Sequence, residues 1–386
     1  MTRDETLALK SKLPNVGESI FSVMTRKALE HDALNLSQGF PDFDTPPELI
    51  ERVHHYMKRQ HNQYAPMPGL PVLRQAIADK MQRTYDTSFD PETEITVTAG
   101  ATQGLYTALS ALIDHKDEVV VIEPAYDAYV PAIKMSKGRP IYVASEHPDY
   151  RFPIEELKKV VNYNTKVILI NNPHNPTGSI LSERDLQQLA KLTRGSDIVL
   201  VGDEVYEHIY FDGHRHLSLS CHTELRQRSV SVFSFGKTYH NTGWKMGYTV
   251  APPEITRELR KVHQFMLFSV FTPGQLAFAD VLNQELLYPE LSAFYQRKRD
   301  LFVNAIQPSR FNVLPCKGGF FVNLDFSGVT RRSDVSFADT LIQEHGLAAI
   351  PNSAFYHDKN DFKTLRFCFA KDDDTLLKAA DILCKI

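Results

Sequence analysis

One lysine stands in a setting that a surface residue does not need. The stretch SVSVFSFGKTYHNTGWKMGY, residues 229–248, places Lys237 after an apolar run and among glycine and hydroxyl side chains. A lysine amine of this kind can form a Schiff base with a carbonyl compound. Ser234 and Lys245 flank it, so that a hydroxyl and a second cation can share one anion nearby. An aldehyde and a phosphate occur together in pyridoxal 5'-phosphate (PLP), the cofactor that this combination favours.

Two other interpretations of the same stretch compete with this one. Most lysines are solvated surface residues, and Lys237 considered alone fits that ordinary role. The letters GKT also end the phosphate-binding pattern G-x-x-x-x-G-K-[ST], but the pattern requires glycine where Ser231 stands. Residues 229–235 have the composition of a strand, which leaves no room for a glycine-rich loop. The P-loop interpretation is therefore excluded.

A PLP site needs a carboxylate at the pyridine nitrogen, and the stretch DIVLVGDEVY offers Asp203 at the end of a strand. Tyr206 follows three residues later and can bring its phenol to the same ligand. Asn175 lies in the turn NNPHNPTG. Each also has an ordinary role, because aspartate caps helices and asparagine is common in turns. We therefore expect these residues to serve the ligand only if the other positions agree.

Three further positions suit an anionic, flat ligand. TAGATQGL has the pattern of a strand, a glycine turn and a helix start, so the N–H groups of residues 101–103 and the hydroxyl of Thr102 can face a phosphate. Tyr126, after VVVIEP, can stack on a ring, although buried tyrosines are commonly core residues. Arg366, in TLRFCFA, can bind a substrate carboxylate through two hydrogen bonds. Its ordinary alternative is a solvated strand face.

The elements that must position these residues alternate between strand and helix over residues 95–250. Continuous apolar strands separated by helices predict an α/β fold with a mostly parallel sheet that is covered on both faces. Ligands bind such sheets beyond the carboxyl ends of the strands. That rule selects five segments, which are residues 100–103, 123–126, 171–175, 203–206 and 234–237.

The rest of the chain predicts a second, smaller part. Residues 254–269 and 288–307 have helical spacing, and the segments GGFFVNLDF, LAAIPNSAFY and KTLRFCFA after them suggest an α+β lobe. A chain of 386 residues exceeds the usual size of one core. We expect a large domain of residues 47–285 and a small domain formed by residues 1–46 plus 286–386.

Composition limits the class of protein. The net charge of -4 gives no sign of a nucleic-acid or membrane partner. The four cysteines are widely spaced and form no metal-binding pattern, which suits a reducing compartment. The N-terminus lacks an apolar signal core, and no run of about 18 apolar residues occurs. We expect a soluble, cytoplasmic protein with no metal site.

The motifs together resemble those of the class I/II aminotransferases of PLP fold type I, over nearly the whole chain. LSQGFPDFDTP, QYAPMPGLPVLRQAIA, TAGATQGL, IEPAYDAY, NNPHNPTG, GDEVYEH and SFGKTYHNTGWKMGY follow in that family's order. The variants QGFPDF and TGWKMGY are most similar to the branch of kynurenine/glutamine-type transaminases and bacterial methionine aminotransferases. One departure is Lys245, where many relatives carry arginine, which keeps the charge but not the forked geometry.

The resemblance implies a role for each position. It makes Lys237 the covalent anchor and proton carrier, with Asp203 and Tyr206 as the other catalytic residues. It implies contacts to the cofactor from Asn175, Ser234, Lys245, Gly100, Ala101, Thr102, Gln103 and Tyr126. It implies that Tyr64 reaches the phosphate of a neighbouring subunit in a homodimer with shared sites. It implies that Arg366, Asn175 and the backbone at Gly39 hold the substrate α-carboxylate.

The implied activity is a two-step transfer of an amino group from an amino acid to a 2-oxo acid. The sequence offers no obvious second arginine for a side-chain carboxylate, which favours uncharged donors such as methionine or aromatic amino acids. Phe21, Tyr126 and Phe271 are candidates for an apolar pocket. A carbon–sulfur β-lyase with the same residues is the closest alternative. A PLP-sensing regulator would carry an added DNA-binding domain, for which we expect no room.

Overall fold

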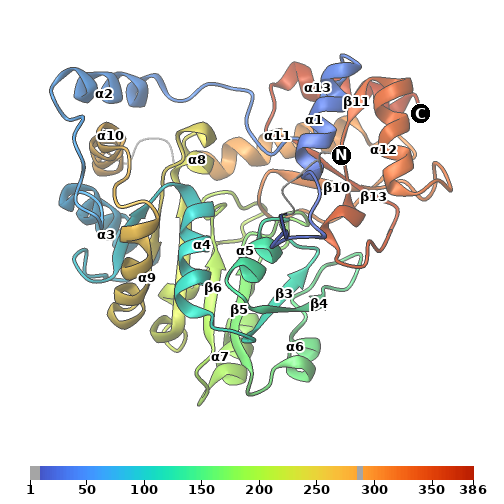
Figure 1. Ribbon diagram of the computed structural model, residues 1–386. Helices are drawn as coiled ribbons and strands as arrows, with labels where there is room; N and C mark the ends of the chain where they lie inside the picture. Colours follow the sequence, from blue (N-terminus) through green and yellow to red (C-terminus); the bar gives the residue numbers. More distant parts are fainter. Residues whose placement is uncertain (1–8, 285–289) are drawn as a thin grey trace, which may run out of the picture.

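The computed structural model describes residues 9–284 and 290–386 (Figure 1). Its central sheet has seven strands in the order β2-β8-β7-β6-β5-β3-β4. Only β8 runs antiparallel to its neighbours in this sheet, so the prediction of a mostly parallel sheet is confirmed. The strands are β2 (Ile95–Thr98), β3 (Glu118–Glu123), β4 (Arg139–Ala144), β5 (Thr165–Asn171), β6 (Val199–Asp203), β7 (Ser229–Ser234) and β8 (Gly247–Val250).

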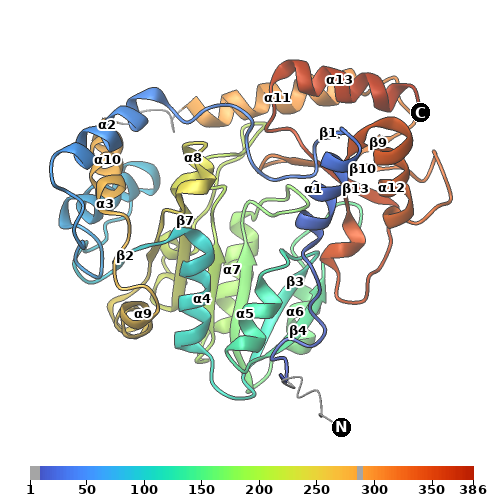
Figure 2. The ribbon, with the colours of Figure 1, turned by 45° about the horizontal axis from the view of Figure 1, so that its top comes forward.

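Helices cover both faces of this sheet, which explains why its central strands are buried along almost their whole length. All six residues of β3 are buried. Helices α4 (Gly100–Leu112), α5 (Tyr129–Met135) and α9 (Pro253–Met266) contribute to the core on one face. Helices α6 (Ile154–Val160) and α7 (Glu183–Thr193) contribute to the core on the other (Figure 2). The N-terminus of α7 is capped by Ser182, whose hydroxyl accepts from the N–H of Asp185 in a capping box.

A third group of helices packs at the β2 edge of the sheet. Helices α2 (Pro47–Lys58), α3 (Pro71–Tyr85) and α10 (Thr272–Asn283) share a core there with β2, β7 and β8. Each of the three helices has proline in its first turn, where a missing N–H costs no helical hydrogen bond.

A second sheet, of four antiparallel strands, lies in the C-terminal part of the chain. Its order is β12-β13-β10-β9, and α11 (Leu291–Ala305), α12 (Asp334–His345) and α13 (Asp373–Cys384) pack against it. The strands are β9 (Asn312–Val313), β10 (Phe321–Asp325), β12 (Ile350–Pro351) and β13 (Thr364–Cys368).

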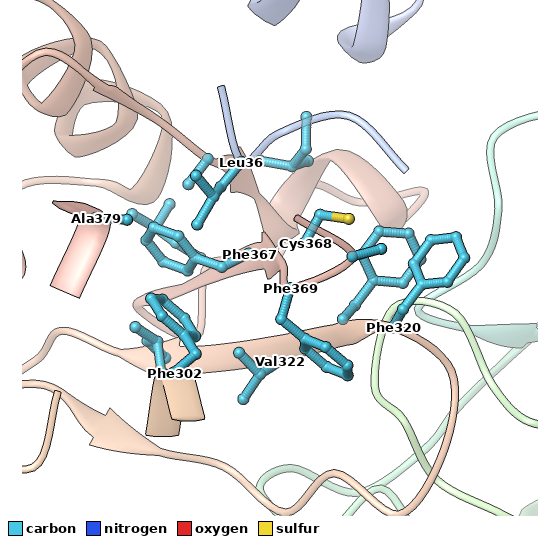
Figure 3. Close-up of a cluster of buried hydrophobic side chains, with 14 of the residues drawn as sticks. Leu36, Phe302, Phe320, Val322, Phe367, Cys368, Phe369 and Ala379 are labelled. Carbon is cyan, nitrogen blue, oxygen red and sulfur yellow. The ribbon is translucent and has the colours of Figure 1, made fainter. Parts of the chain in front are cut away.

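The N-terminal segment joins this C-terminal part. Strand β1 (Leu34–Asn35) pairs with β11 (Leu347–Ala348), and helix α1 (Ile20–Glu30) contributes Met24 and Ala28 to the same core. Figure 3 shows Leu36 beside the rings that fill this core, among them Phe302 and Phe367, whose centroids are 6.2 Å apart. This packing supports the predicted small domain. The domain bounds themselves stay a prediction, and residues 285 and 286 lie outside the described residues.

Short helical turns complete the description. They are α8 (Phe235–Thr238), η1 (Leu219–Cys221), η2 (Arg226–Arg228), η3 (Thr242–Trp244) and η5 (Asn352–Phe355). Within residues 9–284 and 290–386, no helix combines the length and the apolar character that crossing a membrane requires.

Candidate active site

Lys237 lies where β7 ends, in the single turn of α8. Its Nζ donates to the carbonyl of Gly39, at 2.8 Å, and lies 5.6 Å from the centre of the Tyr206 ring. Burial lowers the pKa of Lys237 to about 8, and the nearby cations of Arg366 and Lys245 act in the same direction. The amine is therefore partly unprotonated near neutral pH, as a nucleophile must be.

A cavity of about 320 Å³ opens above Lys237 and collects residues from both sheets. Its volume lies within the range of small-ligand pockets. The charged residues among its lining are the three cations Lys237, Lys245 and Arg366 and the single carboxylate Asp203. The remaining lining includes Phe21, Gln38, Gly39, Gly100, Ala101, Thr102, Tyr126, Asn171, Asn175, Tyr206, Ser234, Thr242 and Phe321.

Asp203 is the last residue of β6, beside Asn171 at the end of β5. Its Oδ2 accepts a hydrogen bond from Tyr129 Oη at 2.6 Å, and its Oδ1 is buried without a side-chain partner in the described structure. Burial raises the pKa of Asp203 to about 6, against the opposing effects of Tyr129, the N–H of Val205 and Lys237. An open, buried carboxylate oxygen at the cavity suits a protonated ring nitrogen.

Arg366 comes from β13 and reaches the cavity from the second sheet. Its Nη1 donates to Asn175 Oδ1 at 2.8 Å, and its Nη2 donates to the carbonyl of Ser37 at 2.9 Å. Its Nε has no hydrogen-bond partner in the part of the chain that the structure describes. Burial lowers the pKa of Arg366 to about 10. Among the described residues, no carboxylate forms an ion pair with the guanidinium. The guanidinium is therefore available to a bound carboxylate.

The opposite end of the cavity suits a phosphate. Helix α4 starts there at Gly100. Its backbone φ of 74° lies in a region that residues other than glycine rarely adopt. Lys245 packs against Gly100 and has a φ of 52° itself. The first turn of α4 carries no acidic residue, so its positive end is not neutralised. Ser234 and Thr242 add hydroxyl groups to the lining of the cavity.

The donor set matches PLP group by group. The anion-binding end suits the phosphate, Lys237 suits the aldehyde, and the open oxygen of Asp203 suits the ring nitrogen. Arg366 is left over for the carboxylate of a second molecule. The cavity can therefore hold PLP together with an amino acid.

Three predicted residues do not line this cavity. The Gln103 side chain turns back along α4, where it accepts from the N–H of Ala99 and donates to Thr107. Tyr64 and Phe271 line a separate surface hollow, and Tyr64 is 83% exposed. The role of Tyr64 on a neighbouring subunit stays a prediction. Phe271 does not contribute to the apolar wall within one chain, whereas Phe21 and Tyr126 do.

Sequence reasoning missed several residues that organise the cavity. Tyr129 was part of the Tyr-rich stretch AYDAY, but only Tyr126 was selected from it. Asn171 donates to the carbonyl of Asp203 and accepts from the N–H of Asn175, so it fixes two site residues at once. It lies within a predicted strand-end segment, which was the available signal. Ser37 acts through its carbonyl, for which a sequence carries no signal.

The comparisons with known proteins agree with this geometry. Residues 31–383 match the family model for aminotransferase class I and II. The chain is 48% identical to the methionine aminotransferase of Escherichia coli over 375 residues, 97% of each chain. It is 33% identical to kynurenine–oxoglutarate transaminase 1 of Homo sapiens, over 90% of this chain and 91% of that one. A crystal structure from Escherichia coli, described as identifying a methionine aminotransferase function, superimposes with a TM-score of 0.96 and 46% identity, over 99% and 100% of the chains.

The contact between Tyr129 and Asp203 yields a prediction. Tyr129→Phe removes a hydrogen bond that favours the ionised carboxylate, so the pKa of Asp203 should rise above its value of about 6 in the ligand-free protein. The measurement is a pH titration of aspartate carboxyl signals by ¹³C NMR, with Asp203→Asn to assign the signal. An unchanged titration midpoint in Tyr129→Phe would show that this contact does not control the carboxylate.

Proposed function

Because this chain belongs to the class I and II aminotransferases and is an amino-acid aminotransferase, we propose that it uses PLP to move the amino group of an uncharged L-amino acid to a 2-oxo acid. Methionine, an aromatic amino acid or a similar residue is the donor in this proposal. The observation that carries it is the cavity itself, in which two further cations and one carboxylate surround a lysine with a lowered pKa.

Each end of the cofactor would have its own residues. Lys237 would hold it covalently, and Asp203 Oδ1 would accept from its ring nitrogen, with Tyr206 and Asn175 near the phenolic oxygen. When bound, PLP supplies an electron-poor ring that lets a proton leave the α-carbon of an amino acid. The phosphate would rest on Ser234, Lys245 and the start of α4, where Gly100, Ala101 and Thr102 line the cavity and Gln103 would offer only its backbone N–H, with Tyr126 beside the ring.

Two residues of the chain would act on the substrate, one by binding it and one by moving a proton. Arg366, held by Asn175 and Ser37, would bind the α-carboxylate and so fix the direction of the α-carbon. Lys237 would carry the proton away from that carbon, because a pKa of about 8 allows its amine to accept and return a proton near neutral pH. The carbonyl of Gly39 is positioned to hold the amine between these steps.

The charge balance of the cavity supports an uncharged side chain on the donor. In this proposal Lys237 and Lys245 serve the cofactor and Arg366 serves the α-carboxylate. No further cation is present among the lining residues, so an acidic side chain would be buried without a partner. Phe21 and Tyr126 offer apolar contact instead. The similarity to the Escherichia coli methionine aminotransferase supports methionine as a donor.

A surface patch supports the proposed homodimer. The last turn of α9 and the link to α10 expose the apolar side chains of Phe265, Met266, Leu267, Phe268 and Phe271. The centres of the Tyr64 and Phe268 rings lie 5.7 Å apart. A contiguous exposed patch of this kind marks an interaction surface. Tyr64 would then lie where it can reach the phosphate of the partner subunit.

Location and domain division complete the proposal. The four cysteines are free, which suits the reducing cytoplasm, where we place the enzyme. A large domain of residues 47–285 would carry the cofactor. A small domain formed by residues 1–46 plus 286–386 would carry Arg366 to the substrate.

The central test is the absorbance of the purified enzyme with PLP during addition of L-methionine without an oxo acid. We expect conversion of the bound cofactor to its amine form and reversal by a 2-oxo acid, with no turnover in Lys237→Ala. Lys261→Ala, which removes a lysine of an exposed ion pair with Glu258, is the control and should behave as the wild type. Near-normal turnover in Lys237→Ala would contradict the scheme. Release of ammonia and an oxo acid without reversal would indicate the lyase.

The homodimer has its own test. Phe265→Asp replaces a ring that is 88% exposed in the single chain with a carboxylate. Burial of that charge against a partner subunit would destabilise the dimer. We expect the dimer to weaken and PLP to dissociate more easily, as measured by light scattering and equilibrium dialysis. Tyr163→Asp, at a ring that is 96% exposed on the loop before β5, is the matched control. Equal masses for both variants at all concentrations would rule out this patch as the interface.

A further inference from the structure

A second polar cluster lies outside the cavity, beneath the residues that the site uses. Lys80 on α3 donates to Glu207, and Glu207 Oε2 also accepts from Tyr85 Oη at 2.8 Å. Tyr85 Oη lies 2.7 Å from His216 Nδ1, and His216 Nε2 lies 3.4 Å from Glu204 Oε2. We name these five residues the buried polar chain. With Tyr85 only partly exposed and the other four buried, their hydrogen bonds are not simply exchanged with water.

The buried polar chain is attached to the segment that carries the catalytic residues. Asp203 faces the cavity from the end of β6, and the next residue, Glu204, points away from it, because side chains alternate along a strand. Glu204 Oε1 accepts from Ser231 Oγ at 2.6 Å and from the N–H of Leu219 at 3.1 Å. Glu207 follows Tyr206 directly. Each of the two catalytic residues therefore adjoins a buried glutamate of the chain.

Gly202 makes room for this arrangement. A Cβ atom at Gly202 would lie 2.8 Å from Glu204 Oε1 and 2.9 Å from a methyl group of Leu219. The carboxyl group of Glu204 thus folds back beneath the strand into a space that only glycine leaves open. It is held there from two sides, by β7 and by the start of η1.

The hydrogen bonds along the buried polar chain leave two atoms facing each other at its end. Tyr85 Oη donates to Glu207 Oε2, so its oxygen is left to accept from His216 Nδ1–H. His216 Nε2 and Glu204 Oε2 then face each other, and neither has another hydrogen bond in the described structure. A single proton between these two atoms would give each of them a hydrogen-bond partner.

Burial decides which of the two carries it. Burial lowers the pKa of His216 to about 3, although the carbonyl of Asn172 and Glu207 act in the opposite direction. Burial raises the pKa of Glu204 to about 7, against the hydrogen bonds from Ser231, Ser218 and Leu219. A neutral acid facing a neutral imidazole costs less in this interior than an ion pair does.

We propose that Glu204 is a positioning residue that acts as a neutral acid, donating a hydrogen bond to His216 and so holding Asp203 and Tyr206 in the geometry that the cofactor requires. This inference rests on the proposed function for the roles of Asp203 and Tyr206. Glu204 is not among the residues that line the cavity. The titratable groups that face Glu204 and His216 from the surrounding elements are Lys80, Tyr85, Glu207, His208, Cys221 and Tyr248.

Two substitutions separate the neutral acid from its alternatives. Glu204→Gln keeps the shape of the protonated acid, with an amide that can donate to His216 and a carbonyl that can accept from Ser231 and Leu219. Glu204→Leu removes all of these bonds. Glu118→Leu is the matched control, because Glu118 is a buried carboxylate that accepts from Asn162 at the opposite end of the sheet.

The first readout is the activity and the cofactor absorbance of the enzyme with PLP bound. We expect kcat within about twofold of the wild type in Glu204→Gln and a loss of roughly tenfold or more in Glu204→Leu, with little change in KM. The pH dependence of the cofactor absorbance should shift in Glu204→Leu and not in Glu118→Leu. A Glu204→Leu enzyme that is less stable but has normal kcat and spectrum would reduce Glu204 to a structural residue.

The second readout needs no activity. Glu204 binds its proton in the folded protein up to about pH 7 but releases it near pH 4.5 when unfolded, so its contribution to stability is lost as the pH rises between these values. The melting temperature of the wild type should therefore fall relative to Glu204→Gln over that window. The proposal that Glu204 is a neutral acid would be overturned if the difference in melting temperature between the wild type and Glu204→Gln stayed constant over this window. It would also be overturned if Glu204→Gln lost as much activity as Glu204→Leu. A wild type that binds no PLP would instead defeat the proposed function.

Discussion

An excess of positive charge in a partly buried cavity is the constraint on which this structure depends. Lys237, Lys245 and Arg366 line the cavity with a single carboxylate, Asp203, and the start of α4 adds a further positive end. Charges that lose water without gaining a partner destabilise a fold. The lowered pKa values of Lys237 and Arg366 are the direct consequence. A ligand that brings a phosphate and a carboxylate would pair with these cations. The unpaired positive charge of the cavity would then favour binding of that ligand.

The fold meets this constraint by taking the charges from separate elements. The parallel strands deliver Asp203 and Lys237 to one edge of the sheet, while Arg366 arrives on a strand of the second sheet. Contacts from Arg366 to Asn175 and to the carbonyl of Ser37 connect the two sheets and the N-terminal segment. The position of the guanidinium therefore depends on all three parts of the chain. In the proposed function, the preference for an uncharged donor would follow from where these cations lie and from the absence of another cation among the lining residues.

The sequence was informative where local chemistry decides the structure. Apolar strands and the rule about their carboxyl ends were sufficient to predict the parallel sheet and most of the cavity lining. The direction of the Gln103 side chain was not predictable, because it depends on the partners Ala99 and Thr107 within α4. The contact of Tyr129 with Asp203 depends on how α5 packs against β6, 74 residues away. Tyr64 and Phe271 lie at a surface, where one chain does not determine what covers them.

The most direct test of the account identifies the residue that holds the cofactor. Borohydride reduction of the enzyme with PLP fixes the cofactor to its lysine, and mass spectrometry of the peptides then locates it. We predict the phosphopyridoxyl group on the peptide that contains Lys237, with Lys245 unmodified. A group on Lys245 or on any other lysine, or no group at all, would contradict the central claim that the lowered pKa and position of Lys237 make it the reacting amine.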